Sequence, residues 1–237
     1  AQVHEPYSPI EEIGPAIVEL AKRSSAPFVV HIDHGEDIDY IAKGLEIGFN
    51  SCMIDGSLRE YEENVRITRE VVAMAHERGI AVEGELGVMT GNENGDPSQG
   101  VADATLYTQP EQARDFVERT GVDCLAASFG TVHGLYRQKP HLNLPLISEL
   151  REAAGVPLVM HGGSGLSEDE YQASIARGVR KINYYTYAAR AAYEAATPLV
   201  NDDKIFLFTN LAKAARDAVE TDVRHFVDTI SARTDAF

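Results

Sequence analysis

Residues 27–35 read PFVVHIDHG, an apolar run that closes on Asp33, His34 and a glycine. Short runs rich in Val and Ile that are bounded by Pro and Gly are typical of buried β-strands. Polar residues directly after such a run lie at the carboxyl end of the strand. The stretch therefore predicts a strand that presents a carboxylate and an imidazole at its end, and the same pattern recurs along the chain.

Further apolar runs follow this one, and stretches with helical periodicity separate them. We expect strands at 27–33, 51–55, 80–86, 123–128, 157–161 and 180–184. We expect helices at 10–23, 38–48, 60–78, 110–120, 145–154 and 168–177. Several of these helices end at a glycine, the residue that best tolerates a left-handed cap. Apolar strands that alternate with helices predict a parallel sheet covered by helices.

The residues that follow the strands favour one kind of parallel sheet. Polar side chains of the types used in active sites stand at the carboxyl ends of all six expected strands. They are Asp33 and His34, Asp55, Glu85, the 128–134 segment, His161 and Asn183. In a (β/α)8 barrel these ends converge on one face, whereas an open doubly wound sheet gathers only the few at its switch point. The sequence therefore predicts an α/β fold of the TIM-barrel type.

The number of expected strands is smaller than a closed barrel needs. Six βα units are visible, and Ala1–Tyr7 has room only for the end of one more strand. We expect the chain to lack part of its N-terminal βα units, on the order of 40–50 residues compared with a typical barrel. Residues 1–237 are then one N-terminally incomplete barrel domain. An extra C-terminal helix is expected at 210–232, suited to a partner subunit or to capping the barrel.

Composition narrows the class of protein. The formal net charge is −16, which disfavours contact with nucleic acid or an anionic membrane surface. No apolar run approaches the roughly 20 residues that span a bilayer, and no signal-peptide pattern opens the sequence. Cys52 and Cys124 lie in apolar, strand-like runs. We expect reduced, buried thiols in a cytoplasmic protein, although one disulfide stays open as an alternative.

Three histidines form the strongest candidate site. His34, His133 and His161 each follow a different strand, and each is followed by a glycine. A single histidine at a strand end is more often a hydrogen-bonded core residue. Three of them at converging strand ends favour a catalytic zinc site, because three neutral imidazoles with one open position are a usual ligand set for that metal.

Asp33 directly precedes one of these histidines. Because adjacent strand residues point to opposite sides, one can line the interior while the loop turns the next toward a metal. A carboxylate beside a metal-bound substrate acts as general acid or base, which is the role we favour for Asp33. The alternative is a carboxylate that orients a histidine, and we assign that orienting role to His31 instead.

Other carboxylates follow at regular intervals. Glu83 and Glu85 face the same side of one strand, where burial is costly unless they are paired or bound to a metal. Asp55 and Glu85 are candidates for a second metal position, and bracing of a helix or loop is an equal alternative. Glu93 lies in the polar, glycine-rich stretch 87–107, where it is either a mobile acid/base delivered by loop closure or a solvated charge.

Two turns predict an anion site. HGGSG at 161–165 follows a strand and precedes a helix, and Asn183–Thr186 closes the last strand and opens another helix. Backbone amides in such turns bind phosphate, and the last two βα turns of barrels frequently form a phosphate site. Lys181 is expected near the start of its strand, at the opposite end of the barrel, so no Schiff-base lysine is evident. We therefore expect catalysis through a bound metal ion rather than through a Schiff base.

Five motifs, taken together, resemble a known family. They are HIDHG (31–35), EGELG (83–87) followed by NENG (92–95), ASFGTVHGLY (127–136), VMHGGSGL (159–166) and KINYYT (181–186). In order and spacing they resemble the class II, zinc-dependent ketose-bisphosphate aldolases of the fructose- and tagatose-bisphosphate type. The resemblance spans about residues 1–195. It implies a (β/α)8 barrel, a homodimer or homotetramer, and a lyase of carbohydrate metabolism and glycolysis that releases dihydroxyacetone phosphate and an aldehyde.

The resemblance also implies residue roles. His34, His133 and His161 match the zinc ligands, Asp33 matches the catalytic acid/base, and Glu93 matches the loop glutamate that moves a substrate proton. Asp55 and Glu85 match an alternative or second divalent-metal position. The expected dihydroxyacetone-phosphate contacts, near which a monovalent cation sometimes binds, are Gly134, Gly162, Gly163, Ser164, Asn183 and Thr186.

Some residues depart from the family pattern. Tyr184 and Tyr185 stand where the family has small or acidic residues, and we count them as substrate-binding positions that reshape the phosphate pocket or reject the usual substrate. Arg137 replaces a lysine that is common in the tagatose branch. Three alternatives stay open: an aldolase for a different ketose phosphate, a degenerate homologue that binds a sugar phosphate without turnover, and another metal-dependent barrel enzyme such as a hydrolase.

Overall fold

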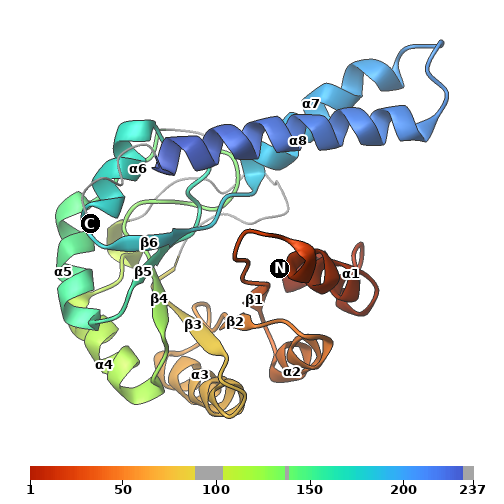
Figure 1. The fold of residues 1–237 in the computed structure, drawn as a ribbon. Coiled ribbons are helices and arrows are strands. Elements are labelled where there is room, and N and C mark those ends of the chain that lie inside the picture. The colour runs from red at the N-terminus through yellow and green to blue at the C-terminus, as the bar shows by residue number, and fades with distance from the viewer. Residues whose placement is uncertain (89–103, 137–138, 232–237) are drawn as a thin grey trace.

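The structure is a computed structural model that describes residues 1–88, 104–136 and 139–231. Helices and strands alternate through most of its length (Figure 1). The strands are β1 His31–Gly35, β2 Ser51–Ile54, β3 Ala81–Leu86, β4 Cys124–Ala127, β5 Leu158–Met160 and β6 Val179–Ile182. The helices are α1 Ile10–Arg23, α2 Ile38–Ile47, α3 Tyr61–His76, α4 Pro110–Thr120, α5 Leu144–Ala154, α6 Glu168–Ile175, α7 Thr186–Val200 and α8 Phe208–Ser231, with short 3-10 turns η1 Gln2–His4 and η2 Ala104–Leu106.

All strands belong to one sheet. It has six strands in the order β1-β2-β3-β4-β5-β6, and every neighbouring pair is parallel. The sheet curls, and helices α2 to α6 follow its outer side (Figure 1). The predicted parallel α/β sheet is therefore confirmed, as a partial barrel. Within the part of the chain that the structure describes, β1 and β6 are edge strands and the eight-stranded closure is not formed.

The first strand differs from the sequence-based expectation. We expected a strand over 27–33, and β1 instead spans His31–Gly35. Phe28 and Val29 are 59% and 67% exposed, because β1 has a neighbour only on its β2 side. Residues before Val30 consequently lack a second strand against which to pair and to bury their side chains.

Local signals fix the helix ends. The Asp37 carboxylate accepts a hydrogen bond from the Tyr40 amide at 2.7 Å and starts α2, and Gly48 ends it at φ +114°. A glycine suits that position because side chains rarely adopt this backbone conformation. At α6, Ser167 and Glu170 form a capping box in which each side chain accepts a hydrogen bond from the other residue's backbone amide.

The last two helices extend away from the sheet. The sequence predicted that a helix opens at the 183–186 turn, without giving its end, and placed the last helix at 210–232, close to the observed span of α8. The two helices pack as an antiparallel pair that projects from the sheet (Figure 1). The end of α8 returns to α6, where the Gln172 side chain donates to the Thr229 carbonyl oxygen at 2.8 Å. None of the described helices combines the length and apolar character that a membrane crossing demands.

Both cysteines are free thiols, which excludes the disulfide alternative. Cys52 is buried in β2, whereas Cys124 in β4 is only half-buried. Burial raises the pKa of each thiol to about 12. These thiols consequently stay protonated near neutral pH and act as small apolar groups in the sheet.

The core lies between the sheet and its outer helices. Gly84 in β3 illustrates how closely the layers approach. A Cβ atom at this position would lie 2.8 Å from the Phe116 ring of α4 and 3.0 Å from a Val122 methyl group. The Phe116 side chain is fully buried in the resulting hollow. Because Gly84 has no side chain, the Phe116 ring of α4 can pack directly against the strand.

We expect Phe116→Ala to lower the free energy of unfolding by about 3–5 kcal/mol, because it leaves a cavity between α4 and β3. Urea unfolding followed by circular dichroism measures the change. The matched control is Val227→Ala, which removes a 47% exposed side chain from α8 and is expected to change stability by less than about 0.5 kcal/mol. Equal losses in the two variants would contradict this packing account.

Candidate active site

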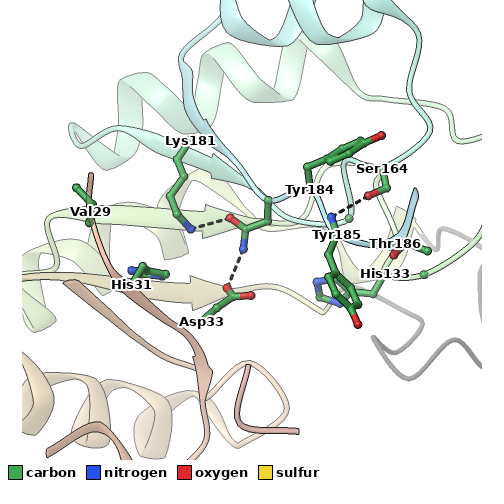
Figure 2. Close-up of a pocket in the computed structure, with 12 residues that line it drawn as sticks. Val29, His31, Asp33, His133, Ser164, Lys181, Tyr184, Tyr185 and Thr186 are labelled. Carbon is green, nitrogen blue, oxygen red and sulfur yellow. Dashed lines mark hydrogen bonds between the residues drawn. The ribbon is translucent and has the colours of Figure 1, made fainter. Parts of the chain in front are cut away.

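A cavity of about 350 Å³ opens at the carboxyl ends of the strands. Figure 2 shows side chains from both edges of the sheet entering it. Its lining comprises Val29, His31, Asp33, His133, Gly134, Gly162, Ser164, Lys181, Asn183, Tyr184, Tyr185 and Thr186. Most of the residues that the sequence predicted as catalytic or substrate-binding therefore line one cavity, although they come from widely separated parts of the chain.

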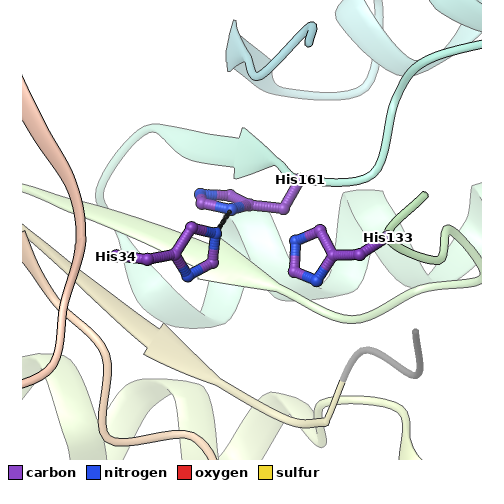
Figure 3. Close-up of side chains that lie close together, drawn as sticks. All are labelled: His34, His133 and His161. Carbon is purple, nitrogen blue, oxygen red and sulfur yellow. Dashed lines mark hydrogen bonds between the residues drawn. The ribbon is translucent and has the colours of Figure 1, made fainter. Parts of the chain in front are cut away.

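Three histidines meet at the base of this region. His34 belongs to β1, His133 follows β4 and His161 directly follows β5, and their rings face one another (Figure 3). The ring centroids of His34 lie 5.0 Å from His133 and 4.6 Å from His161. One nitrogen from each ring lies within 4.8 Å of the others. The parallel sheet thus assembles three imidazoles that are up to 127 residues apart in sequence.

The backbone at His34 explains how two neighbouring residues reach the same site. His34 adopts φ +45°, a left-handed conformation that is uncommon for a residue with a side chain. The register between β1 and β2 also shifts between Ile32 and Gly35. This irregularity breaks the strict alternation of the strand. Asp33 can therefore line the cavity while His34 turns toward the other histidines.

The donor set fits a divalent transition metal. His161 Nδ1 lies 2.9 Å from His34 Nε2, and His133 Nε2 is buried without a hydrogen-bond partner. Burial, with the neighbouring histidines His161 and His34, lowers the pKa of His133 to about 3, so this ring is neutral near pH 7. Neutral imidazole is the form that binds zinc. The ring nitrogens of the three histidines meet within 4.8 Å of one another, and a three-histidine ligand set leaves one coordination position of zinc open.

Two carboxylates fix the orientation of the rings. His34 Nδ1 lies 2.7 Å from Asp55 Oδ2, and His161 Nε2 lies 2.7 Å from Glu83 Oε1. Each pair uses one ring nitrogen and turns the other toward the centre of the triad. Burial disfavours the charge on Glu83, but the hydrogen bond with His161 and the charge of Lys181 lower its pKa to about 2. Glu83 is consequently a buried anion that needs its partners.

Glu85 differs from the other carboxylates. It is buried, and its Oε2 atom has no hydrogen-bond partner. Burial and the nearby charge of Asp55 raise the pKa of Glu85 to about 8. His34, Asp55 and Glu85 also form a second group whose donor atoms lie within 4.8 Å of one another. An unpaired oxygen at such a place fits a second position for a cation.

Asp33 faces the cavity from β1. The Asn183 side-chain amide donates to Asp33 Oδ1 at 2.8 Å (Figure 2). Burial opposes ionisation of Asp33, but the nearby His161 and His34 rings hold the pKa of this carboxyl below its usual range. Asp33 is therefore ionised near neutral pH and able to accept a proton from a bound hydroxyl group.

The glycine turn after β5 depends on close backbone contact. Gly162 has φ +62°, and a Cβ atom there would lie 2.3 Å from the Val132 carbonyl oxygen. The Tyr136 and Tyr171 hydroxyls donate to the carbonyl oxygens of Gly162 and Gly163. Ser164 Oγ accepts a hydrogen bond from the Tyr185 amide at 3.3 Å. These contacts fix a turn with polar groups beside the cavity.

Gly163 and Tyr184 differ from the other predicted substrate-binding residues. Gly163 packs toward Ile182 and Met160 and is not part of the cavity lining. Tyr184 lines the cavity, but its ring stacks on Phe226 of α8 at a centroid distance of 4.0 Å, and its hydroxyl donates to Asp222 at 2.8 Å. Glu93 and Arg137 lie outside the described residues.

Two expectations about the site were wrong. We placed Lys181 at the far end of its strand, but its Nζ lies in the cavity, 2.7 Å from Asn183 Oδ1. The strand begins at Val179, so Lys181 shares a face with Asn183; their spacing of two residues was the available signal. His31 does not orient a candidate ligand directly: its Nδ1 lies 2.7 Å from Ser51 Oγ and its Nε2 3.8 Å from Glu83.

Comparison with known proteins agrees with this geometry. The family model for class II fructose-bisphosphate aldolase matches residues 2–234. The fructose-bisphosphate aldolase of Geobacillus stearothermophilus is 38% identical over 200 residues, which cover 84% of this chain and 68% of that protein. An Escherichia coli protein named YdjI, described as uncharacterized, is 39% identical over 214 residues, 89% of this chain and 73% of its own.

Two solved structures of proteins titled as aldolases superpose on nearly the whole of this chain. The crystal structure of the YdjI aldolase from Escherichia coli K12 superposes with a TM-score of 0.84 at 33% identity, covering 99% of this chain and 81% of that one. A putative fructose-1,6-biphosphate aldolase from Coccidioides immitis superposes with a TM-score of 0.82 at 32% identity, covering 98% and 80%.

We expect a metal-free Glu85→Gln variant to become more stable, relative to the unchanged chain, as the pH rises from about 5 to 8. The folded-state pKa of about 8 exceeds the ordinary value of 4.5. Between these values the folded chain keeps a proton that the unfolded chain has lost, so the free energy of unfolding of the unchanged chain falls, by up to about 1.4 kcal/mol per pH unit. Glutamine does not titrate.

Thermal unfolding in the presence of EDTA at several pH values measures this difference. A stability difference between the two chains that stays constant from about pH 5 to 8 would contradict a proton held on Glu85.

Proposed function

The chain belongs to the class II fructose-bisphosphate aldolase family and is an aldolase, a carbon–carbon lyase; on that premise we propose that it reversibly cleaves a phosphorylated ketose into dihydroxyacetone phosphate and an aldehyde. The observation that carries this proposal is the meeting of three imidazoles, one of which, His133, lines the same cavity as Asp33 and Asn183. The names of the Geobacillus and Coccidioides relatives support a fructose-bisphosphate-like substrate, and the motif resemblance keeps a tagatose-bisphosphate-like one as the alternative.

We assign the metal to the three histidines. His34, His133 and His161 would hold one Zn²⁺, and Asp55 with Glu85 would offer a second or alternative divalent position. A bound zinc ion supplies Lewis-acid polarisation of the ketose C2 carbonyl. The unpartnered nitrogen of His133 and the unpartnered oxygen of Glu85 support these two positions, because buried polar atoms rarely lack a partner. A monovalent cation near the glycine turns is the alternative to a second divalent ion.

Asp33 performs the proton transfer at C4. During cleavage its carboxylate accepts the proton of the C4 hydroxyl, the C3–C4 bond breaks, and C4 leaves as the aldehyde carbon. During condensation Asp33 returns the proton to the aldehyde oxygen. The Asn183 amide fixes the carboxylate for this step through its 2.8 Å hydrogen bond. We assign to Glu93 the proton that C3 gains after cleavage.

The phosphate of dihydroxyacetone phosphate binds at the two turns beside the cavity. Ser164 and Thr186 line the cavity, and α7 begins at Thr186, so its first amides are available to an anion. Gly134, Gly162, Gly163 and Asn183 complete the proposed contacts. Tyr185 lines the same cavity and is 49% exposed, which makes it a surface for the bound sugar.

We extend the proposal to the domain and its assembly. Residues 1–237 form a single aldolase-type domain whose six strands belong to a (β/α)8 barrel, and the protein is a cytoplasmic homodimer or homotetramer. Apolar side chains at the tip of the α7–α8 pair support the assembly. Phe206 and Phe208 are 86% and 79% exposed there, and a partner subunit would cover them.

The test is release of dihydroxyacetone phosphate from a panel of ketose mono- and bisphosphates, measured with a coupled dehydrogenase assay. We expect release from at least one ketose phosphate, loss of activity with EDTA and recovery with zinc. Metal-loaded protein that binds a sugar phosphate without turnover would indicate a degenerate homologue. Hydrolysis products without carbon–carbon cleavage would indicate a hydrolase. Either result contradicts the proposal.

Two substitutions separate the proposed roles. We expect Asp33→Ala to lower kcat by about 100- to 10,000-fold and to keep its zinc, because it removes a general acid/base but no ligand. We expect His133→Ala to lose the zinc itself. Metal analysis and steady-state kinetics measure both effects, and borohydride with substrate is expected to trap no adduct. Full zinc content in His133→Ala, or a trapped lysine adduct, would contradict these roles.

A further inference from the structure

Lys181 is the charged side chain in the cavity that the proposed mechanism does not use. It lies in β6, and its Nζ is 2.7 Å from Asn183 Oδ1 and 2.9 Å from Glu83 Oε2. Figure 2 shows the next link, in which the amide beside Lys181 also bonds to Asp33. An unbroken chain of hydrogen bonds therefore runs from the buried Glu83 through Lys181 and Asn183 to Asp33.

The chemistry of an ammonium group determines which way the Asn183 amide points. An ammonium has three donors and no acceptor, so it can contact only the oxygen of that amide. The NH₂ group of Asn183 must then face the other way, toward Asp33 Oδ1 at 2.8 Å. A flipped amide would place an oxygen against the Asp33 carboxylate, where two acceptors repel each other. Lys181 thus selects the amide orientation in which Asn183 donates to Asp33.

Glu83 fixes Lys181 in turn. The carboxylate is 1% exposed, and its two oxygens are divided between His161 Nε2 and Lys181 Nζ. A buried carboxylate needs charged or hydrogen-bonding partners, so the lysine is held at this place even though its side chain is 36% exposed. Glu83 therefore orients His161, a candidate metal ligand, and also holds Lys181 in place. Lys181 in turn orients Asn183.

We propose that Lys181 is a positioning residue, which fixes the amide of Asn183 and through it the carboxylate of Asp33 for proton transfer at C4. The proposal rests on the proposed aldolase function. It predicts that loss of Lys181 impairs proton transfer at C4, which uses Asp33. Proton exchange at C3, which does not use Asp33, should stay unchanged. A Schiff-base role is the competing assignment, and it requires Lys181 to leave both of its acceptors.

The kinetic test compares Lys181→Met with Lys181→Arg. In Lys181→Met we expect kcat for ketose-phosphate cleavage to fall by about 10- to 100-fold, the effect of losing one hydrogen bond to a charged group, with KM within about 3-fold. The second measurement is the rate at which the hydroxymethyl protons of dihydroxyacetone phosphate (C3 of the ketose) exchange with D₂O, followed by NMR. This rate should stay within about 3-fold of that of the unchanged chain because Asp33 takes no part in the exchange. Lys181→Arg keeps a charged donor and should retain cleavage within about 5-fold.

The matched control is Lys43→Met, which removes a partly exposed lysine that pairs with Glu11 at 3.3 Å on the outer helices. It should change neither cleavage nor exchange. Equal losses of cleavage and exchange in Lys181→Met would show a general effect on the site and overturn the proposal. Unchanged cleavage would overturn it as well. A borohydride-trapped adduct in the unchanged chain that disappears in Lys181→Arg would replace it with the Schiff-base role.

A crystal structure of Lys181→Met provides a readout besides activity. We expect the Asn183 amide to rotate or to part from Asp33, while zinc content equals that of the unchanged chain. An Asn183–Asp33 contact that persists at 2.8 Å would overturn the proposal. If the unchanged chain cleaves no ketose phosphate, the aldolase function fails, and this structural comparison still decides whether Lys181 positions Asn183. Should Lys181→Met not fold, the same comparison is made with Lys181→Gln.

Discussion

Buried carboxylates paired with imidazoles are the interaction on which the site depends. Glu83 and His161 are almost fully excluded from water, and His34 pairs with Asp55 beside them. Each pair offsets the cost of burying a charge only if the partners keep their geometry. The pairing also determines which ring nitrogen faces the centre. The stability of the strand ends and the arrangement of the metal donors therefore have the same physical cause.

The parallel sheet provides the second constraint. It sends the carboxyl ends of all its strands to one face, so each polar residue after a strand enters the same region. The irregular backbone at His34 adds a second functional side chain from β1. The outer helices anchor this frame, and the Asn64 side chain of α3 donates to the Glu85 carbonyl oxygen at 2.9 Å. Packing beneath the strand ends thus maintains distances within the site.

Residue patterns predicted the six strands and most of the cavity-lining residues because both follow from periodicity and from the convergence of parallel strands. The patterns failed where the bounds of a strand or the position of a side chain depend on residues that are distant in the sequence and close in the fold. The start of β1 moved to His31 because one of its edges lacks a partner strand. Lys181 was missed because a long side chain reaches far beyond its own Cα atom, and no pattern reveals that Glu83 would attract it. Tyr184 lines the cavity, and no pattern revealed that its ring would also stack on Phe226 and its hydroxyl bond to Asp222 of α8.

The central claim is that three imidazoles share one divalent ion, and X-ray absorption at the zinc edge tests it most directly. For the zinc-reconstituted protein the account predicts a first shell that contains three imidazole nitrogens at about 2.0–2.1 Å, with their characteristic outer-shell scattering. A zinc ion bound only by carboxylate oxygens, or by sulfur, would contradict the account.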